Sequence, residues 1–343
     1  MLYKITTYAE DLLRQSVEAL MSSVYRGVHG IYEIKGEIQG PSQPTLYVGT
    51  YTHGDELLSG SPILPLLKGD IRLKRGRILL AVNNLEATQM GLRMVPGEID
   101  FNRLPLEDVM TSSDSNPSLS LQRLQSLGKI VLEASHGFEI HTTPSKPYLA
   151  MRLPIKGDQA FSEAIDAEIS ILNITQFQKD CRDPDGPCTL AFGNYIGGLE
   201  NPIPVVELEG GGPQTAENNP LLYESILRAL LSVLARLDMI DAEEYGLSPK
   251  TIIRKVYEVI DWQWASPGYV LPRLFEPFAY LKKGDVVMQD GTDSGLPPIL
   301  MPEDGHLVLH PSYKIKDGKP MPSTHPKDWF VSKPVHLESV EVL

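Results

Sequence analysis

A histidine and a glutamate, His53 and Glu56, stand three residues apart in the stretch 49–56, which directly follows an apolar run at residues 46–48. The run is typical of the end of a buried strand, so both side chains leave that strand on one turn. An imidazole and a carboxylate placed in this way can point at one cation. Zinc accepts both at about 2.0–2.2 Å, and a catalytic zinc keeps a fourth position for water. The same spacing also occurs in ordinary turns, so a third ligand and a base are needed elsewhere.

Two later apolar runs end in suitable residues. Residues 137–141 form a short strand-like run that ends in His141, and residues 203–208 include Glu207 just before three glycines. In open α/β sheets, ligands bind at the carboxyl ends of the strands. A carboxylate in a buried strand costs desolvation energy unless it is paired or used in chemistry. The sequence therefore predicts that His53, Glu56 and His141 meet at one edge of a sheet, together with Glu207.

The elements that must position these side chains follow from the apolar pattern. Helical spacing predicts helices over residues 7–24, 57–67, 119–134, 160–172 and 221–237, the second one interrupted at Pro62 and Pro65. Strands are predicted over residues 32–38, 46–50, 77–83, 137–141 and 203–208. Because strands alternate with helices, we expect an α/β fold with a mixed, mostly parallel sheet flanked by helices on both faces.

The composition changes after about residue 244. From there on, short β-like runs are separated by turn signals such as those at residues 283–285, 290–291 and 303–305. This pattern indicates a smaller all-β domain. We therefore predict a catalytic domain over residues 1–245 and a C-terminal β domain over residues 246–343.

Composition excludes several classes of partner. The net charge of −13 argues against nucleic acid, which requires clustered basic residues. No apolar segment approaches the ~18–20 residues of a membrane span. The first residues lack the apolar core of a signal peptide, so a cytoplasmic location is expected. Cys181 and Cys188 allow a disulfide, half of a zinc site or free thiols, and free thiols are favoured in a reducing compartment.

Four motifs in order carry a resemblance to a known family. They are His-Gly-Asp-Glu at 53–56, Asp-Phe-Asn-Arg at 100–103, Glu-Ile-His-Thr-Thr at 139–143 and Val-Glu-Leu at 206–208. Together they resemble the succinylglutamate desuccinylase/aspartoacylase family, which belongs to the zinc-carboxypeptidase-like superfamily. The match covers about residues 40–240, and the C-terminal part also looks like the β domain of that family.

The resemblance implies roles for individual residues. It implies that His53, Glu56 and His141 bind one zinc ion per chain, and that Glu207 is the general base. It further implies that Asn102 and Arg103 hold a substrate carboxylate, and that Arg93 helps to polarise the scissile carbonyl.

The chain departs from the family in three places, one of which is a longer spacing from Arg93 to Asn102 than aspartoacylases have. Glu139 stands where the family commonly has aspartate. Glu209 is an additional carboxylate that leaves the base open between Glu207 and Glu209.

The sequence thus predicts a zinc-dependent hydrolase that cleaves the amide bond of a small, anionic N-acylated amino acid or a related compound. A zinc carboxypeptidase acting on peptides and a zinc-binding protein without catalysis are the alternatives. A serine hydrolase is not expected, because the chain has no Gly-x-Ser-x-Gly elbow. The acyl group, the amine, the physiological metal and a homo-oligomeric state stay open.

Overall fold

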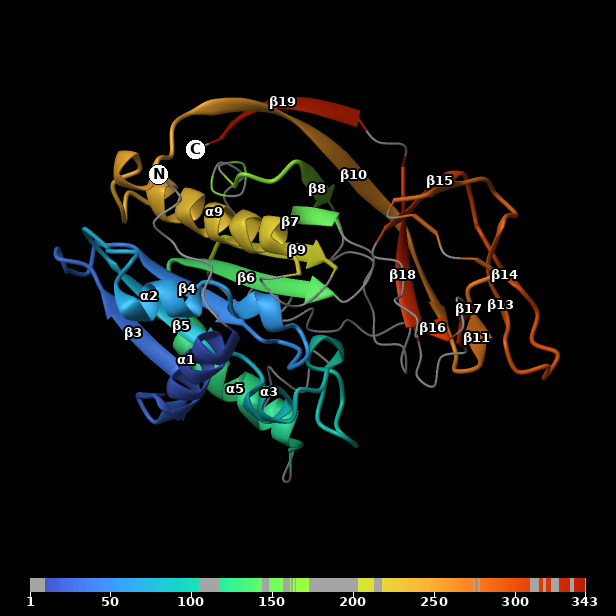
Figure 1. Cartoon of the computed structure of the whole chain (residues 1–343), viewed down its shortest axis with the longest axis horizontal. Helices are drawn as coiled ribbons and strands as arrows, with labels where there is room; N and C mark the ends of the chain where they lie inside the picture. Colours follow the sequence, from blue (N-terminus) through green and yellow to red (C-terminus); the bar gives the residue numbers. More distant parts are fainter. Residues whose placement is uncertain are drawn as a thin grey trace.

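The computed structural model describes residues 10–104, 117–143, 148–156, 161, 163, 165–172, 203–212, 218–273, 275–276, 278–308, 315–316, 319–321, 327–333 and 336–342. A long mixed sheet runs through these residues and is flanked by helices in the first two thirds of the chain (Figure 1). Cys181 and Cys188 lie outside the described residues. Within them, no helix combines the length and the apolar character that crossing a membrane would require.

The central sheet has the order β3-β5-β4-β6-β9-β7-β8-β10. Neighbours pair in parallel except at β3–β5 and β7–β9. The expected mixed, mostly parallel sheet is therefore confirmed. Its strands are β3 (Ile31–Lys35), β4 (Thr45–Thr50), β5 (Arg77–Val82), β6 (His136–Thr143), β7 (Tyr148–Lys156), β8 (Ile169–Leu172), β9 (Val205–Gly211) and β10 (Lys250–Ala265).

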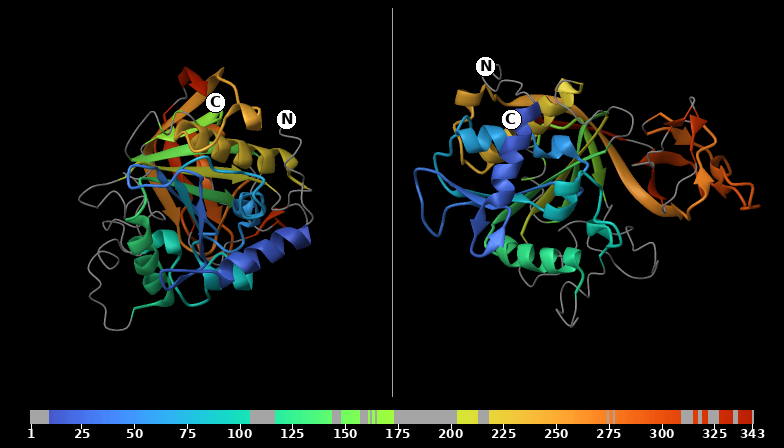
Figure 2. Two further views of the ribbon diagram at one scale, coloured as in Figure 1. Left: turned by 90° about the vertical axis from the view of Figure 1, so that its left-hand side faces the viewer. Right: turned by 60° about the horizontal axis from the view of Figure 1, so that its bottom comes forward.

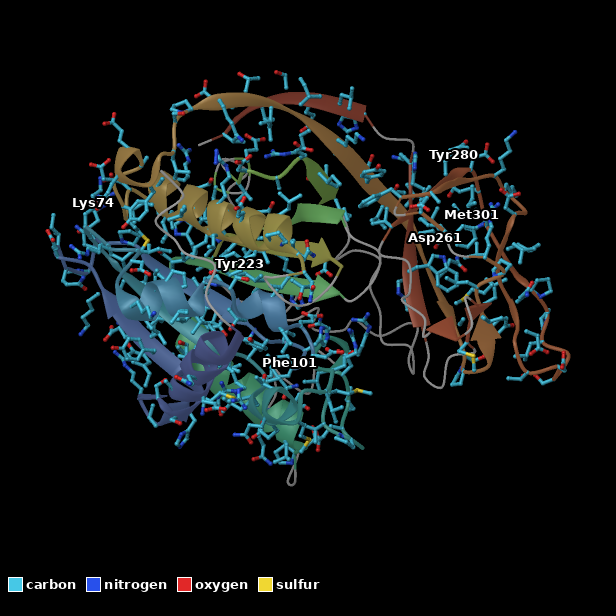
Figure 3. All side chains as sticks on the ribbon, viewed as in Figure 1. Lys74, Phe101, Tyr223, Asp261, Tyr280 and Met301 are labelled. Carbon is cyan, nitrogen blue, oxygen red and sulfur yellow. The ribbon has the colours of Figure 1, made fainter. Side chains whose placement is uncertain are left out.

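Successive strand residues point to opposite faces, so buried apolar side chains lie on both faces of this sheet. Helices cover both faces. On one face, α1 (Glu10–Ser22), α2 (Ile63–Lys68) and α9 (Pro220–Arg236) pack on alternate residues of β4, β5, β6 and β9. On the other face, α5 (Leu119–Val131) and the 3₁₀ turn η3 (Phe101–Arg103) form a second core. Figure 3 labels Tyr223 of the first core and Phe101 of the second.

Two of the helix predictions need comment. The segment 57–67 is interrupted as expected, into the 3₁₀ turn η2 (Leu57–Gly60) and α2, with Pro62 at the N-cap of α2. The helix predicted over residues 160–172 is wrong at its end, because Ile169–Leu172 is the strand β8. β8 is enclosed between β7 and β10, and a short apolar run of this kind cannot be assigned by periodicity alone.

The C-terminal part is all β, as expected. It contains β11 (Tyr269–Val270), β12 (Tyr280–Leu281), β13 (Val286–Asp290), β14 (Ile299–Leu300), β15 (Gly305–Val308), β16 (Ile315–Lys316), β17 (Lys319–Pro320), β18 (Lys327–Ser332) and β19 (His336–Val342). Its own core includes Met301, which is labelled in Figure 3.

One strand, β10, belongs to both parts of the molecule. Its first half pairs with β8 of the central sheet and with β19, and its second half pairs with β18. The register shifts between Val259 and Asp261. Figure 2 shows this strand extending from the helix-flanked sheet toward the short strands of the C-terminal part. The two parts are therefore joined by a continuous hydrogen-bonded strand.

Removing a core side chain from α9 tests the packing of the first face. Leu230 is fully buried there, so Leu230→Ala should lower the free energy of unfolding by about 2–5 kcal/mol. Leu221→Ala, on the same helix with 64% of the residue exposed, is the matched control. Urea denaturation that gave equal midpoints for the two variants would contradict this packing.

Candidate active site

The turn after β4 places His53 and Glu56 inside the protein. Both residues are only 3% exposed. Tyr51, just past the strand, has a positive φ of 53° and is fixed by a hydrogen bond from its backbone N–H to the Ser59 hydroxyl. Gly54 lies against the backbone of Ala87, and a Cβ at Gly54 would overlap the Ala87 carbonyl. The turn is therefore held by close packing that only glycine permits at this position.

His53, Glu56 and His141 converge as the sequence predicts, and we call these three residues the ligand group. One ligand atom of each lies within 4.8 Å of the others. Glu56 Oε1 is 2.5 Å from His53 Nδ1, and Glu56 Oε2 is 3.4 Å from His141 Nδ1. The backbone N–H of Thr142 donates to Glu56 Oε2 at 3.1 Å. Two imidazole nitrogens and one carboxylate, all buried, are a donor set that suits zinc.

The histidines of the ligand group hold their protons more tightly because Glu56 lies beside them. Burial alone would lower the pKa of His141, but its hydrogen bond and charge interaction with Glu56 raise that pKa to about 10. Burial would also lower the pKa of His53, yet Glu56 and Asp100 raise it. Burial would raise the pKa of Glu56, but the two histidines lower it well below its usual range. Without any metal, protons held by the neighbouring histidines thus offset the negative charge of the Glu56 carboxylate.

Asp100 connects the ligand group to the predicted substrate residues, a role that sequence reasoning missed. Its carboxylate accepts hydrogen bonds from Arg93 Nε at 2.9 Å and from the Asn102 backbone N–H at 2.9 Å, and lies 3.2 Å from His53 Nε2. A proton on His53 Nε2 that is shared with Asp100 leaves Nδ1 to face the ligand group. Burial raises the pKa of Asp100, but Arg93 and His53 together lower it well below its usual range.

The signal for Asp100 is present in the sequence. It stands two residues before Asn102 in the motif at 100–103 and caps the 3₁₀ turn η3 through the Asn102 N–H. Its contact with His53, by contrast, joins segments 47 residues apart, and periodicity carries no information about such a contact.

The structure places the predicted substrate residues around this carboxylate. Arg93 has a half-exposed side chain. Asn102 is buried, and its Oδ1 has no hydrogen-bond partner among the described residues. Arg103 donates from Nη1 to the Asn102 carbonyl at 3.3 Å. All the site residues predicted from the sequence are thus in the described part of the structure, while their roles remain predictions.

Further carboxyl groups line the neighbouring ends of β6 and β9. In the parallel ladder, Glu139 is the register partner of Glu207, and His141 is the partner of Glu209. Glu139, His141 and Glu207 also form a buried group whose ligand atoms lie within 4.8 Å of one another. Glu139 accepts a hydrogen bond from Asn83 at 3.0 Å. Glu207 Oε1 and His141 Nε2 are buried and have no hydrogen-bond partner in the part of the chain that the structure describes.

The carboxyl groups of β9 hold their protons unusually tightly. Burial raises the pKa of Glu207 to about 8; His141 opposes this rise, and the charges of Glu139, Glu209 and Glu56 add to it. Burial and the charge of Glu56 likewise raise the pKa of Glu209 to about 8, against the opposing effect of the nearby cationic groups. Glu207 can therefore exchange a proton near neutral pH, as a general base or acid must.

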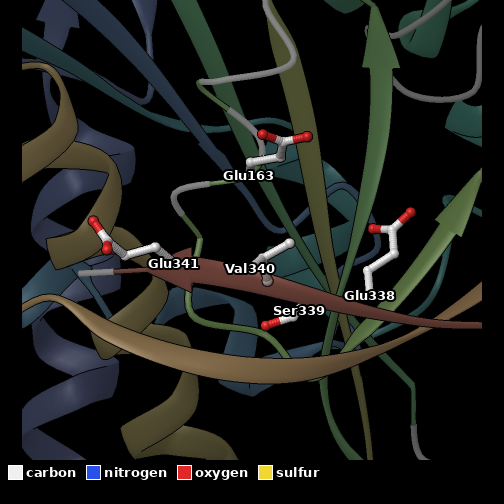
Figure 4. Close-up of a pocket in the computed structure, with 5 residues that line it drawn as sticks. All are labelled: Glu163, Glu338, Ser339, Val340 and Glu341. Atoms are coloured by element: carbon white, nitrogen blue, oxygen red, sulfur yellow. The ribbon is translucent and has the colours of Figure 1, made fainter.

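A pocket of about 560 Å³ lies elsewhere, on β19. Glu163, Glu338, Ser339, Val340 and Glu341 line it, as Figure 4 shows. It contains none of the residues of the ligand group, and its lining offers no histidine or cationic side chain.

Comparisons with known proteins support the fold. No family model and no curated protein matches the sequence. Solved structures do match: the product-bound ectoine utilization protein EutE from Ruegeria pomeroyi has a TM-score of 0.57 at 16% identity, with 89% of this chain and 88% of that chain covered. A succinylglutamate desuccinylase/aspartoacylase from Rhodobacter sphaeroides has a TM-score of 0.53 at 19% identity. The match covers 89% of this chain and 88% of that chain. A mutant murine aminoacylase 3 has a TM-score of 0.53 at 13% identity. The match covers 87% of this chain and 96% of that chain.

These structures show that the chain has the fold of the succinylglutamate desuccinylase/aspartoacylase proteins. The resemblance drawn from the four motifs is therefore confirmed at the level of the fold.

Gly54→Ala should weaken metal binding. The added Cβ would push the turn away from Ala87 and misplace His53 and Glu56, at a cost of about 1–3 kcal/mol, or roughly tenfold or more in zinc affinity. Competition titration with a fluorescent zinc chelator measures this change. Leu57→Ala, which removes an exposed side chain on the same turn, should keep the wild-type affinity. An unchanged affinity in Gly54→Ala would refute the proposed rigidity of the turn.

Zinc binding should also release protons. The raised pKa of His141, about 10, keeps its ring protonated at neutral pH, whereas zinc requires a neutral imidazole nitrogen. Zinc affinity should therefore rise as the pH increases from about 6 toward 10. Titration calorimetry of the apoprotein at pH 7, in two buffers of different ionisation enthalpy, measures the protons released. Zinc binding without proton release would contradict the assignment of His141 as a ligand.

Proposed function

We propose that this protein is a zinc-dependent hydrolase that cleaves the amide bond of a small N-acylated amino acid or a related compound. The observation that carries the proposal is the convergence of the ligand group with Glu207 at the carboxyl ends of β4, β6 and β9. Structures with the same fold are named as a desuccinylase/aspartoacylase and an aminoacylase, which supports this reaction class.

The ligand group would hold the zinc ion. When bound there, zinc would lower the pKa of a water molecule toward about 7 and polarise the acyl carbonyl. Asp100 would orient His53 by accepting its Nε2 proton, and the Thr142 N–H would fix the Glu56 carboxylate. Other divalent metals can share these ligands, so metal identity is part of the test.

Glu207 would act as general base and then as general acid. Its Oε1 is buried, has no hydrogen-bond partner within the described ranges and belongs to a carboxyl group whose pKa burial raises to about 8. A group with a pKa near the working pH can accept the proton of the attacking water and later deliver it to the leaving amine. Its position beside His141 keeps this proton transfer close to the ligand group.

Two arginines would position the substrate. Arg103, with the amide of Asn102, would hold a carboxylate, because a guanidinium matches a carboxylate through two parallel hydrogen bonds. Arg93 would face the acyl carbonyl, and Asp100 would fix its guanidinium through Nε. We place this activity in residues 1–245 and assign the β-rich residues 246–343 to a separate C-terminal domain.

Glu207→Gln separates catalysis from metal binding. The amide keeps the shape of the side chain but cannot take a proton, so kcat should fall by about 10²–10⁴-fold. Zinc content, measured by mass spectrometry, should stay near that of the wild type. The assay follows release of the free amine from a panel of N-acetyl and N-succinyl amino acids. Glu224→Gln, an exposed residue of α9, is the matched control.

Other outcomes would redirect the proposal. Turnover of peptides with free C-termini, but not of N-acyl amino acids, would make the protein a carboxypeptidase. Zinc binding with no turnover on either panel would leave a metal-binding protein without catalysis. Full activity in Glu207→Gln would contradict the role of this residue as the base.

A further inference from the structure

The Asn83 side chain is a polar amide that lies entirely inside the protein. Asn83 directly follows β5, and the residue is 0% exposed. Its backbone N–H donates to the Thr50 carbonyl at 2.8 Å, so Asn83 lies beside the carboxyl end of β4. Burying an amide costs free energy unless its donors and acceptors find partners. The partners of this amide therefore indicate what it does.

The amide nitrogen of Asn83 joins the two segments that carry the ligand group. It donates to Thr52 Oγ1 at 2.9 Å and to Glu139 Oε1 at 3.0 Å. Thr52 precedes His53 in the turn after β4, and Glu139 stands two residues before His141 on β6. An asparagine side chain has two N–H donors, so Asn83 uses both of them to connect the turn to the strand.

Tyr47 determines which way the amide faces. Its phenol O–H donates to Asn83 Oδ1 at 2.6 Å. Burial raises the pKa of Tyr47 well above its usual range, so the phenol keeps its proton and remains a donor. If the amide were reversed, its oxygen would face the Glu139 carboxylate, and two acceptors would meet without a proton between them. The observed orientation therefore satisfies both ends of the amide.

Two further features hold Asn83 in this place. Arg123 of α5 donates from Nε to the Asn83 carbonyl at 2.9 Å and from Nη2 to the Val82 carbonyl at 2.6 Å. Gly49 is the register partner of Glu139 in the β4–β6 ladder. A Cβ at Gly49 would lie 2.8 Å from Asn83 Nδ2 and 3.0 Å from Glu139 Oε1, which is too close for a side chain. The hydrogen bond between these two residues therefore has room because residue 49 is glycine.

We propose that Asn83 is a positioning residue for the metal ion. Its amide fixes the turn after β4 against β6, so that His53 and Glu56 stay at binding distance from His141. The inference rests on the zinc site of the proposed function and not on the identity of the substrate. Ligands have to be held within about 0.5 Å of the productive geometry, and Asn83 acts on the metal only through these ligands.

Removing the donors of Asn83 tests the proposal. Asn83→Leu keeps a side chain of similar size but has no N–H to donate. Its zinc affinity, measured by competition with a fluorescent chelator, should be about 10–100-fold weaker than that of the wild type, as for other groups that orient metal ligands.

Thr52 supplies a conservative pair that tests the same contact if Asn83→Leu does not fold. Thr52→Val keeps the shape of the side chain but removes the hydroxyl that accepts from Asn83, so zinc affinity should fall. Thr52→Ser keeps the hydroxyl and should keep the wild-type affinity. In Asn83→Leu combined with Thr52→Val, the loss should be close to that of Asn83→Leu alone, because both changes remove the same hydrogen bond.

A spectroscopic measurement separates positioning from a general loss of stability. Cobalt(II) can occupy sites of this kind, and its visible absorption bands depend on the geometry of the ligands. These bands should shift or change intensity in Asn83→Leu. Leu230→Ala weakens the packing of α9 instead, so it should lower the urea midpoint but keep the zinc affinity and the cobalt spectrum.

Failure of this proposal is distinguishable from failure of the proposed function. Wild-type affinity and an unchanged cobalt spectrum in folded Asn83→Leu would overturn the role of Asn83, and so would equal weakening by Thr52→Val and Thr52→Ser. A wild-type protein that binds no zinc would remove the ligand group and this inference with it. Zinc binding without hydrolysis of any N-acyl amino acid would end the proposed function alone, because affinity and spectra require no turnover.

Discussion

The Glu56 carboxylate is the point on which the site depends. One oxygen contacts His53, and the other lies beside His141 and accepts the Thr142 N–H, so one buried side chain joins the turn after β4 to the end of β6. A buried carboxylate is tolerated only when it is paired in this way or bound to a metal. The two histidines therefore have to remain close to it, and so do the strands that carry them.

The parallel sheet makes this meeting possible. β4, β6 and β9 are adjacent and parallel, so their carboxyl ends lie at one edge, and alternation along β6 and β9 sends Glu139, His141 and Glu207 to the same face. Burial raises the pKa of Glu207, so this residue can exchange a proton near neutral pH. Asp100 holds His53 and Arg93 in place. Metal binding, proton transfer and substrate orientation thus share one hydrogen-bonded arrangement.

Much of this could be predicted from local sequence. The apolar runs that end at Thr50, His141 and Glu207 identify buried strands, and parallel pairing brings their ends together. The sequence does not identify Asp100 as a positioning residue, because that role depends on its contact with His53, which is far away in the sequence. β8 was mistaken for helix because its neighbours β7 and β10, rather than its own four residues, decide its conformation. The pairing of β10 with both β8 and β18 is likewise decided by its partner strands and not by its own sequence pattern.

The central claim is that one metal ion sits between His53, Glu56 and His141. Anomalous diffraction at the zinc absorption edge, from crystals of the protein loaded with zinc, locates that ion directly. The account predicts a strong peak within about 2.0–2.2 Å of one nitrogen of each histidine and an oxygen of Glu56. A peak between Glu139 and Glu207 and away from Glu56, or no peak in the zinc-loaded crystals, would contradict it.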